Sequence, residues 1–380
     1  MQILSGITLL AIVFAVLSSG SQSVASPTLP AASSAVGWPN QPGVKITREY
    51  PRDENGMRTA LVRYKSIDAF LKCTTKRSQH TAEIQAISAL STDFHHSSHI
   101  GFPTLLDLFS TGDGYHCIIT KQIAGASLRE YVAQLSREEK GSFLQNFALT
   151  AILAVMHMHE RKVIHGNINP DNIIIQPTTV SKNVFKVLFT GFEGSQPTSR
   201  SQTPSILGAR GYAPPEDYFN AAVDQRKRDT WMLGATFFFV TNGIPPYGFA
   251  HSKTKGTFPP VSEDRLLRTM MKAEKAGKNS FPRIKTNRKG LLDLMERFLT
   301  YKAEDRVNID LLTEDDLMVL VDDELDAKDS LLERTWAKLK SKMPRKKISG
   351  RQVKSPQDTD AWHEYQGNDG NQDTPLLASK

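Results

Sequence analysis

The sequence predicts an α+β fold with two lobes, a small lobe of antiparallel strands over residues 44–122 and a larger helical lobe over residues 123–330. In the first region, short runs rich in β-branched residues are separated by turn sequences such as Asn55-Gly56. In the second region, apolar residues recur at helical spacing, most regularly over residues 141–160. The change from one pattern to the other places the border between the lobes.

The small lobe is expected to contain strands over residues 44–50, 57–64, 105–110 and 115–121, and a helix over residues 81–90. The larger lobe is expected to begin with a helix capped by Ser127. The apolar positions of 141–160 cover a wide face, which indicates a helix buried in a core. Further helices are predicted over residues 230–240, 264–276 and 288–299.

The net charge of +7, from 47 Lys and Arg against 40 Asp and Glu, is too modest to indicate a nucleic-acid partner. The positive charge is concentrated in the tail, residues 331–380, which we expect to be polar and largely disordered. That basic run is either a solvated tail or a site for an anionic membrane surface or an acidic partner. Its members are Lys338, Lys340, Lys342, Arg345, Lys346, Lys347, Arg351 and Lys354.

The N-terminus has the pattern of a secretory signal. Residues 3–17 are almost wholly apolar, and Ser23-Val24-Ala25 is a small-x-small cleavage sequence. We therefore expect a signal peptide over residues 1–25, cleaved after Ala25, and a flexible leader over residues 26–43. A signal anchor is the alternative. In an oxidising compartment Cys73 and Cys117 could form one disulfide, or they could remain buried thiols.

The segment Val163 to Asn172 (VIHGNINPDN) resembles the protein-kinase catalytic loop V-I-H-R-D-L-K-P-E-N. The departures fall on the chemistry. The loop Asp of kinases accepts the proton of the substrate hydroxyl, and here that position is Asn167, a neutral amide. The loop Lys, which faces the transferred phosphate, is Asn169. The final Asn172 is kept, but one neutral oxygen is a poor Mg²⁺ site by itself.

The next motif, Gly191-Phe192-Glu193, is the counterpart of the kinase D-F-G. The Asp that binds Mg²⁺ in kinases is replaced by Gly191, which has no ligand atoms. Glu193 lies two residues further on, and we expect its side chain to point away from the cleft. Motifs that hold the kinase C-lobe together are retained, namely Glu216 in an A-P-E-like motif, Asp229, and Arg306. The resemblance predicts a buried Glu216–Arg306 ion pair.

On the nucleotide side, no G-x-G-x-x-G precedes the first hairpin. Residues 44–50 look like the second strand of the kinase lobe, so the strand that leads into the Gly-rich loop is expected to be missing. Arg63 is favoured as the replacement of the kinase strand Lys, and Lys72 is the alternative. Either residue would pair with Glu83, and either ion pair could have a purely structural role.

The remaining cleft residues follow from the same resemblance. Thr120 falls at the gatekeeper position and Lys121 at the start of the hinge. Because the strand of Cys117 and the segment of Cys73 are neighbours in kinases, a disulfide between them is geometrically conceivable.

The secretory signal, the absent Gly loop and the degenerate His165-Gly166-Asn167 together resemble the rhoptry-kinase family of apicomplexan parasites, in particular its With-No-Gly-loop subgroup. The resemblance covers about residues 44–325. It implies export into a parasitophorous vacuole or cyst wall. Active members of the subgroup keep both catalytic Asp residues, so their kinase activity is not carried over to this chain.

These features together predict a secreted pseudokinase that acts as a binding or scaffold module, without a cofactor or metal and without tight binding of ATP-Mg. Its expected partner is a secreted parasite or host protein, including an active kinase of the same family. One alternative is an unconventional Ser/Thr kinase that uses Glu193 or Asp171. The other is a membrane-associated or matrix protein that acts through its basic tail.

Overall fold

The computed structural model describes residues 38, 41–52, 56–91, 99–178, 184–198, 208–219, 222–250, 252 and 258–320. All of them belong to the first of two compact units, Met1–Val321; the second unit is Asp322–Lys380. The predicted cleavage site at Ala25 and the basic tail, Lys338 to Lys354, lie outside the described residues.

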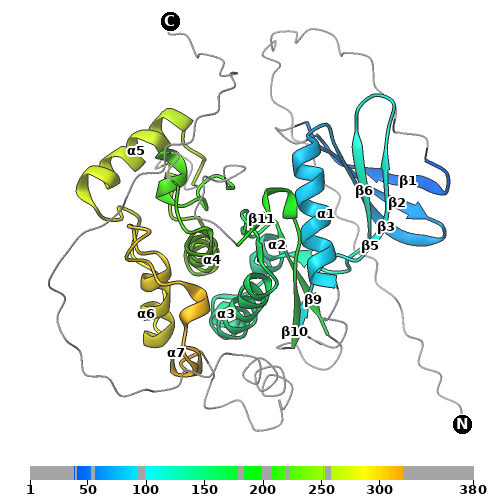
Figure 1. Cartoon of the computed structure of the whole chain (residues 1–380). Helices are drawn as coiled ribbons and strands as arrows, with labels where there is room; N and C mark the ends of the chain where they lie inside the picture. Colours follow the sequence, from blue (N-terminus) through cyan, green and yellow to red (C-terminus); the bar gives the residue numbers. More distant parts are fainter. Residues whose placement is uncertain are drawn as a thin grey trace, which may run out of the picture. The chain divides into compact units, whose positions relative to one another are not determined.

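The small lobe is built on a five-stranded antiparallel sheet (Figure 1). Helix α1 (Arg77–Ser91) packs against this sheet. In spatial order the strands are β1 (Val44–Glu49), β2 (Arg58–Tyr64), β3 (Ile67–Thr74), β6 (His116–Lys121) and β5 (Leu105–Ser110).

One face of this sheet forms the core of the lobe. Alternate residues of β2, β3 and β6 are buried on it, from Ala60 and Val62 to Ile119. Cys73 and Cys117 lie directly opposite each other on β3 and β6 and form a disulfide, with 4.1 Å between their Cα atoms. The opposite face of the same strands carries the cleft residues described below.

The expectation that a strand of this lobe is missing is wrong. Kinases carry their lysine on the third strand, and here two strands, β1 and β2, precede the strand that carries Lys72. The β1–β2 connection, Tyr50 to Met57, therefore stands where kinases have the Gly-rich loop, and Gly56 is its only glycine. The motif is lost, but the hairpin that would carry it is retained.

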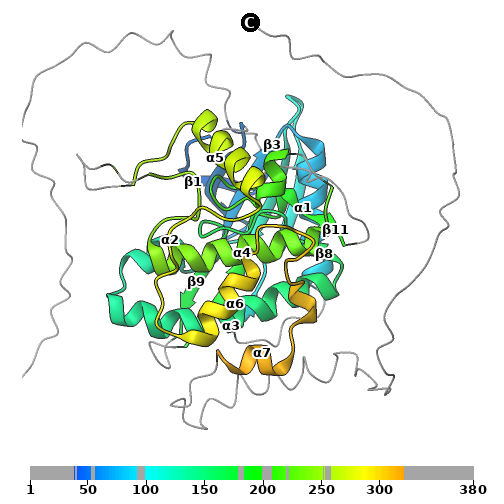
Figure 2. The ribbon, with the colours of Figure 1, turned by 90° about the vertical axis from the view of Figure 1, so that its left-hand side faces the viewer.

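The large lobe is helical, with α3 and α4 packed against each other at its centre (Figure 2). Nearly every side chain of α3 from Phe143 to His159 is buried, as its apolar pattern predicts. Of the helices in the described ranges, α3 alone has the length and composition of a membrane span, and it is buried in the domain as a core helix. The helices are α2 (Leu128–Ala133), α3 (Arg137–Glu160), α4 (Gln225–Asn242), α5 (Glu263–Ala276), α6 (Lys289–Phe298) and α7 (Glu314–Met318).

Short strands carry the loops that form the site. A four-stranded sheet has the order β4 (Ile100–Gly101), β10 (Phe185–Phe189), β9 (Ile173–Pro177) and β7 (Ala126–Ser127). Strand β8 (Val163–Ile164) pairs with β11 (Gln196–Pro197). The turns η1 (Phe192–Gly194), η2 (Pro215–Phe219) and η3 (Ile309–Leu311) are 3₁₀ helices. The predicted bilobal α+β fold is thus confirmed.

Candidate functional site

A cavity of about 470 Å³ is lined by residues of both lobes. This volume is within the range of small-molecule sites. Thr120 and Lys121 both line it, at the positions expected for the gatekeeper and the hinge. The β1–β2 connection contributes Tyr50 and Met57, and the sheet contributes Thr59, Leu61, Phe70, Lys72 and Ile118. The other side contributes Asp171, Asn172, Ile174, Thr190, Gly191 and Glu193.

Lys72 is the strand lysine of this cleft. Its Nζ donates to both carboxylate oxygens of Glu83 on α1, at 3.0 and 2.9 Å. Arg63, which we favoured from the sequence, instead pairs with Asp68 at 2.6 Å, and both side chains are more than half exposed. The strand register explains the difference, because Thr59 pairs with Lys72 whereas Arg63 lies at the outer end of the β2–β3 hairpin. The Arg63 assignment is therefore wrong.

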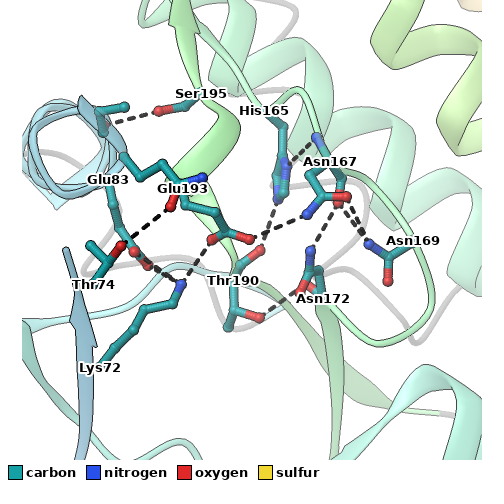
Figure 3. A network of polar contacts seen from close by, with 12 residues as sticks. Lys72, Thr74, Glu83, His165, Asn167, Asn169, Asn172, Thr190, Glu193 and Ser195 are labelled. Carbon is teal, nitrogen blue, oxygen red and sulfur yellow. Dashed lines mark hydrogen bonds and ion pairs between the residues drawn. The ribbon is translucent and has the colours of Figure 1, made fainter. Parts of the chain in front are cut away.

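Glu193 points into the cleft, contrary to the expectation from its position in the sequence (Figure 3). One of its carboxylate oxygens lies 2.8 Å from Lys72 Nζ, and the other accepts from Asn167 Nδ2 at 3.3 Å. Glu193 is carried by the 3₁₀ turn η1, which begins directly after Gly191, a residue with a left-handed backbone (φ 77°).

The buried charges of this cluster influence one another strongly. Burial acts to lower the pKa of Lys72, but the carboxylates of Glu193 and Glu83 outweigh it, so that the pKa is raised and the ammonium stays charged. Burial likewise acts to raise the pKa of Glu193, but Lys72 outweighs it and the pKa is lowered. The pKa of Glu83 is raised, chiefly by burial. The inner end of the cleft therefore holds one cation and two carboxyl groups.

The catalytic-loop amides bond to one another. Asn169 Nδ2 donates to the backbone oxygen and to Oδ1 of Asn167, at 3.0 and 3.2 Å. Asn172 Nδ2 donates to the Asn167 backbone oxygen at 3.0 Å, and the Ala209 amide donates to Asn167 Oδ1 at 3.2 Å. Asn167 thus stands where kinases have the catalytic Asp, with its side-chain oxygen already used as an acceptor. A neutral amide in this position does not act as a general base.

At Gly191, where kinases have the metal-binding Asp, the space for a side chain is taken by Asn172. A Cβ atom at Gly191 would lie 2.5 Å from Cγ of Asn172, so the amide of Asn172 occupies the space that an aspartate side chain would need. Within the described ranges no three His, Cys, Asp or Glu side chains form a cluster that could hold a metal ion.

Asp229 of α4 anchors the backbone of the catalytic loop. Its two carboxylate oxygens accept from the backbone amides of His165 and Gly166, each at 2.8 Å. Gly166, which replaces the loop Arg of kinases, has φ 74°, and a Cβ there would collide with the Gly194 carbonyl. Arg228 Nη1 donates to the Gly166 carbonyl at 2.8 Å. An arginine from α4 thus supports the loop at the point where its own arginine is absent.

Two buried ion pairs hold the large lobe together. Arg306 donates to both oxygens of Glu216, at 2.6 and 3.0 Å, which is the pair expected from the sequence. Arg228 makes a second buried pair with Asp217, with a closest distance of 2.6 Å. Sequence reasoning missed this second pair, since Asp217 and Arg228 belong to no motif that we used.

Comparisons with known proteins agree with the geometry. The family model of the protein kinase domain matches residues 58–318. The serine/threonine-protein kinase HAL4/SAT4 of Saccharomyces cerevisiae is 24% identical over 198 residues, which cover 47% of this chain and 31% of the relative. The serine/threonine-protein kinase PknB of Mycobacterium leprae is 26% identical over 175 residues, covering 44% and 27%. PrkC of Bacillus subtilis is 24% identical over 153 residues, covering 40% and 23%.

A bilobal fold with a strand lysine paired to a helix glutamate, an Asp229-anchored loop and a Glu216–Arg306 pair defines a protein-kinase-like domain. The chain belongs to the protein kinase domain family. The matched region covers less than a third of the length of each of these relatives.

Proposed function

We propose that this protein is a pseudokinase, a member of the kinase family that transfers no phosphate and acts as a binding or scaffold module. The observation that carries the proposal is the pair of lost carboxylates. Asn167 stands in place of the base, and Gly191 stands in place of the metal ligand, with Asn172 packed into the vacated space. Positioning and electrostatic stabilisation of the phosphate supply most of the catalysis in kinases, and both depend on these groups.

The retained interactions favour a binding role. The Glu216–Arg306 and Asp217–Arg228 pairs and the Asp229 contacts with the loop are all buried. They preserve the shape of the large lobe rather than the chemistry of the cleft. A rigid lobe with an altered cleft is suited to presenting a surface to another protein.

The cellular setting is part of the proposal and rests on sequence. The apolar run 3–17 and the Ala25 cleavage sequence suggest secretion, and the resemblance to With-No-Gly-loop rhoptry kinases suggests a parasite vacuole or cyst wall. A secreted protein, including an active kinase of the same family, would be the partner. Lys338 to Lys354 would add contact with an anionic membrane, and pelleting with anionic vesicles, with and without residues 336–380, tests that contact.

The decisive test is a thermal-shift titration of the purified protein with ATP, with and without Mg²⁺ or Mn²⁺. We expect no metal-dependent rise in melting temperature, because a ligand stabilises the native state only if it binds there. A parallel assay with labelled ATP should show no transfer above a heat-inactivated sample, with PknB as the positive control. A metal-dependent shift together with transfer would contradict the proposal.

The position of Glu193 in the cleft raises a second candidate function, which the same labelled-ATP assay tests. If its carboxylate replaced the lost metal ligand, the chain would be an unconventional Ser/Thr kinase. Transfer would then be present in the wild type and lost in both Glu193→Gln and Asn172→Ala. The geometry argues against this reading, since both oxygens of Glu193 are engaged by Lys72 and Asn167.

A further inference from the structure

Lys72 contacts two carboxylates, although a single carboxylate would balance the positive charge of its ammonium. Glu83 accepts from Lys72 Nζ with both oxygens, and Glu193 adds a second anion at 2.8 Å. All three side chains are largely buried. In protein kinases the lysine of the third strand also meets two anions, the helix glutamate and the α- and β-phosphates of the nucleotide. Glu193 therefore occupies the place of the second anion.

The turn that carries Glu193 is held on both sides, and its carboxylate points toward Lys72 and Asn167 (Figure 3). Phe192, its neighbour in η1, is fully buried and packs on His165 with 4.6 Å between ring centroids. On the other side, Ser195 Oγ donates to the Ala82 carbonyl of α1 at 2.9 Å. The Asn167 amide donates to the second oxygen of Glu193. The position of this carboxylate is thus built into the turn that follows Gly191.

The consequence is electrostatic. Lys72 is already paired with Glu83 and Glu193, and a phosphate that approached Lys72 would meet the Glu193 carboxylate at short range. At such distances in a partly desolvated site, repulsion between like charges is strong. The 470 Å³ cavity is also lined by Phe70, Ile118 and Thr120, which carry no charge.

We propose that Glu193 is a built-in anion that closes the phosphate-binding end of the cleft, so that the cleft rejects polyphosphates and removal of this carboxylate uncovers a polyphosphate site on Lys72. The inference deepens the proposed function and rests on it, since it explains why an inactive kinase would also lack nucleotide. It assigns to Glu193 a role in ligand selection that is separate from the loss of the two kinase aspartates replaced by Asn167 and Gly191.

The experiment compares the full chain with Glu193→Ala and Glu193→Gly, the second of which restores the glycine of D-F-G. Glu296→Ala, which removes an exposed carboxylate from α6, is the matched control. Each protein is titrated with ATP and with adenosine in EDTA, by calorimetry and thermal shift. We expect both Glu193 variants to bind ATP at least about tenfold more tightly than the wild type, with an unchanged response to adenosine. Adding Lys72→Met should abolish the gain.

Three outcomes would overturn the inference. These are a rise of the wild-type melting temperature with metal-free ATP, folded Glu193 variants without a gain, and a gain that survives Lys72→Met. The first needs no variant, and circular dichroism establishes folding for the others. Phosphate transfer by a Glu193 variant would instead contradict the proposed function and leave this inference intact. Lack of an affinity gain would contradict the inference and leave the pseudokinase proposal standing.

Discussion

At the scale of single residues, Gly191 links the lost chemistry to the local structure. Its φ of 77° lies in the left-handed region, which residues with a Cβ adopt only at a cost in conformational free energy. The adjacent space is taken by Asn172. The aspartate of kinases is therefore replaced by a residue without a side chain, and Asn172 fills the adjacent space, so that Gly191→Asp alone would not restore a metal site.

We therefore expect Gly191→Asp to destabilise the protein by about 2–4 kcal/mol, from the unfavourable φ and the overlap with Asn172. It should not create Mg²⁺-dependent stabilisation. Urea unfolding with and without Mg²⁺ measures both effects. Gly112→Asp is the control, because Gly112 has an ordinary φ and open space around its Cβ direction, so its effect should stay within about 0.5 kcal/mol. A more stable Gly191→Asp protein would contradict this account.

At the scale of elements, the β2–β3 hairpin shows where sequence reasoning failed. Its two-residue turn, Lys65-Ser66, has positive φ at both residues (46° and 69°), as a type I′ turn requires. Asn and Gly usually fill such turns, so Lys65-Ser66 is no signal that a strand ends at Tyr64 and another begins at Ile67. Because the third strand was not recognised, Arg63 was preferred to Lys72 as the counterpart of the kinase strand lysine.

Other elements were predictable because their signals are local. The capping box of α2, with Ser127 and Glu130, and the wide apolar face of α3 are visible in the sequence and present in the structure. The orientation of Glu193 was not predictable, because it depends on the left-handed conformation of Gly191 and on contacts with Lys72, which is 121 positions away. Motif spacing locates a residue but does not show where its side chain points.

The Glu216–Arg306 pair joins η2 to the segment before η3, and its loss tests how strongly these elements depend on it. Arg306→Met should cost about 3–5 kcal/mol, because the buried Glu216 carboxylate would lose its partner. The exposed Arg63–Asp68 pair provides the comparison, and Arg63→Met should cost less than about 1 kcal/mol. Chemical denaturation of both variants measures the difference. Equal costs would show that burial does not decide the strength of these pairs.

At the scale of the whole domain, one buried histidine joins three parts of the large lobe. His159 of α3 lies 3.1 Å from Asp229 of α4 and 2.9 Å from Asp310 of η3, and Arg226 of α4 also pairs with Asp310, at 3.1 Å. Burial acts to lower the pKa of His159, but the two aspartates outweigh it and raise the pKa to about 9. The imidazolium is therefore part of the network that also anchors the catalytic loop through Asp229.

The raised pKa of His159 predicts how the stability of the domain depends on pH. The folded pKa of about 9 is above the ordinary value of 6.5, so the stabilisation is fully present below pH 6.5 and is lost as the pH rises through 9. The shift corresponds to about 3 kcal/mol of unfolding free energy. His165 and His80, whose pKa values are lowered, act below pH 6.5 and do not contribute to this window. Urea unfolding of the wild type between pH 6.5 and 9.5 should show the decline, and His159→Gln should flatten it. A wild-type profile that is flat in this range, or the same slope in the variant, would remove His159 as the cause.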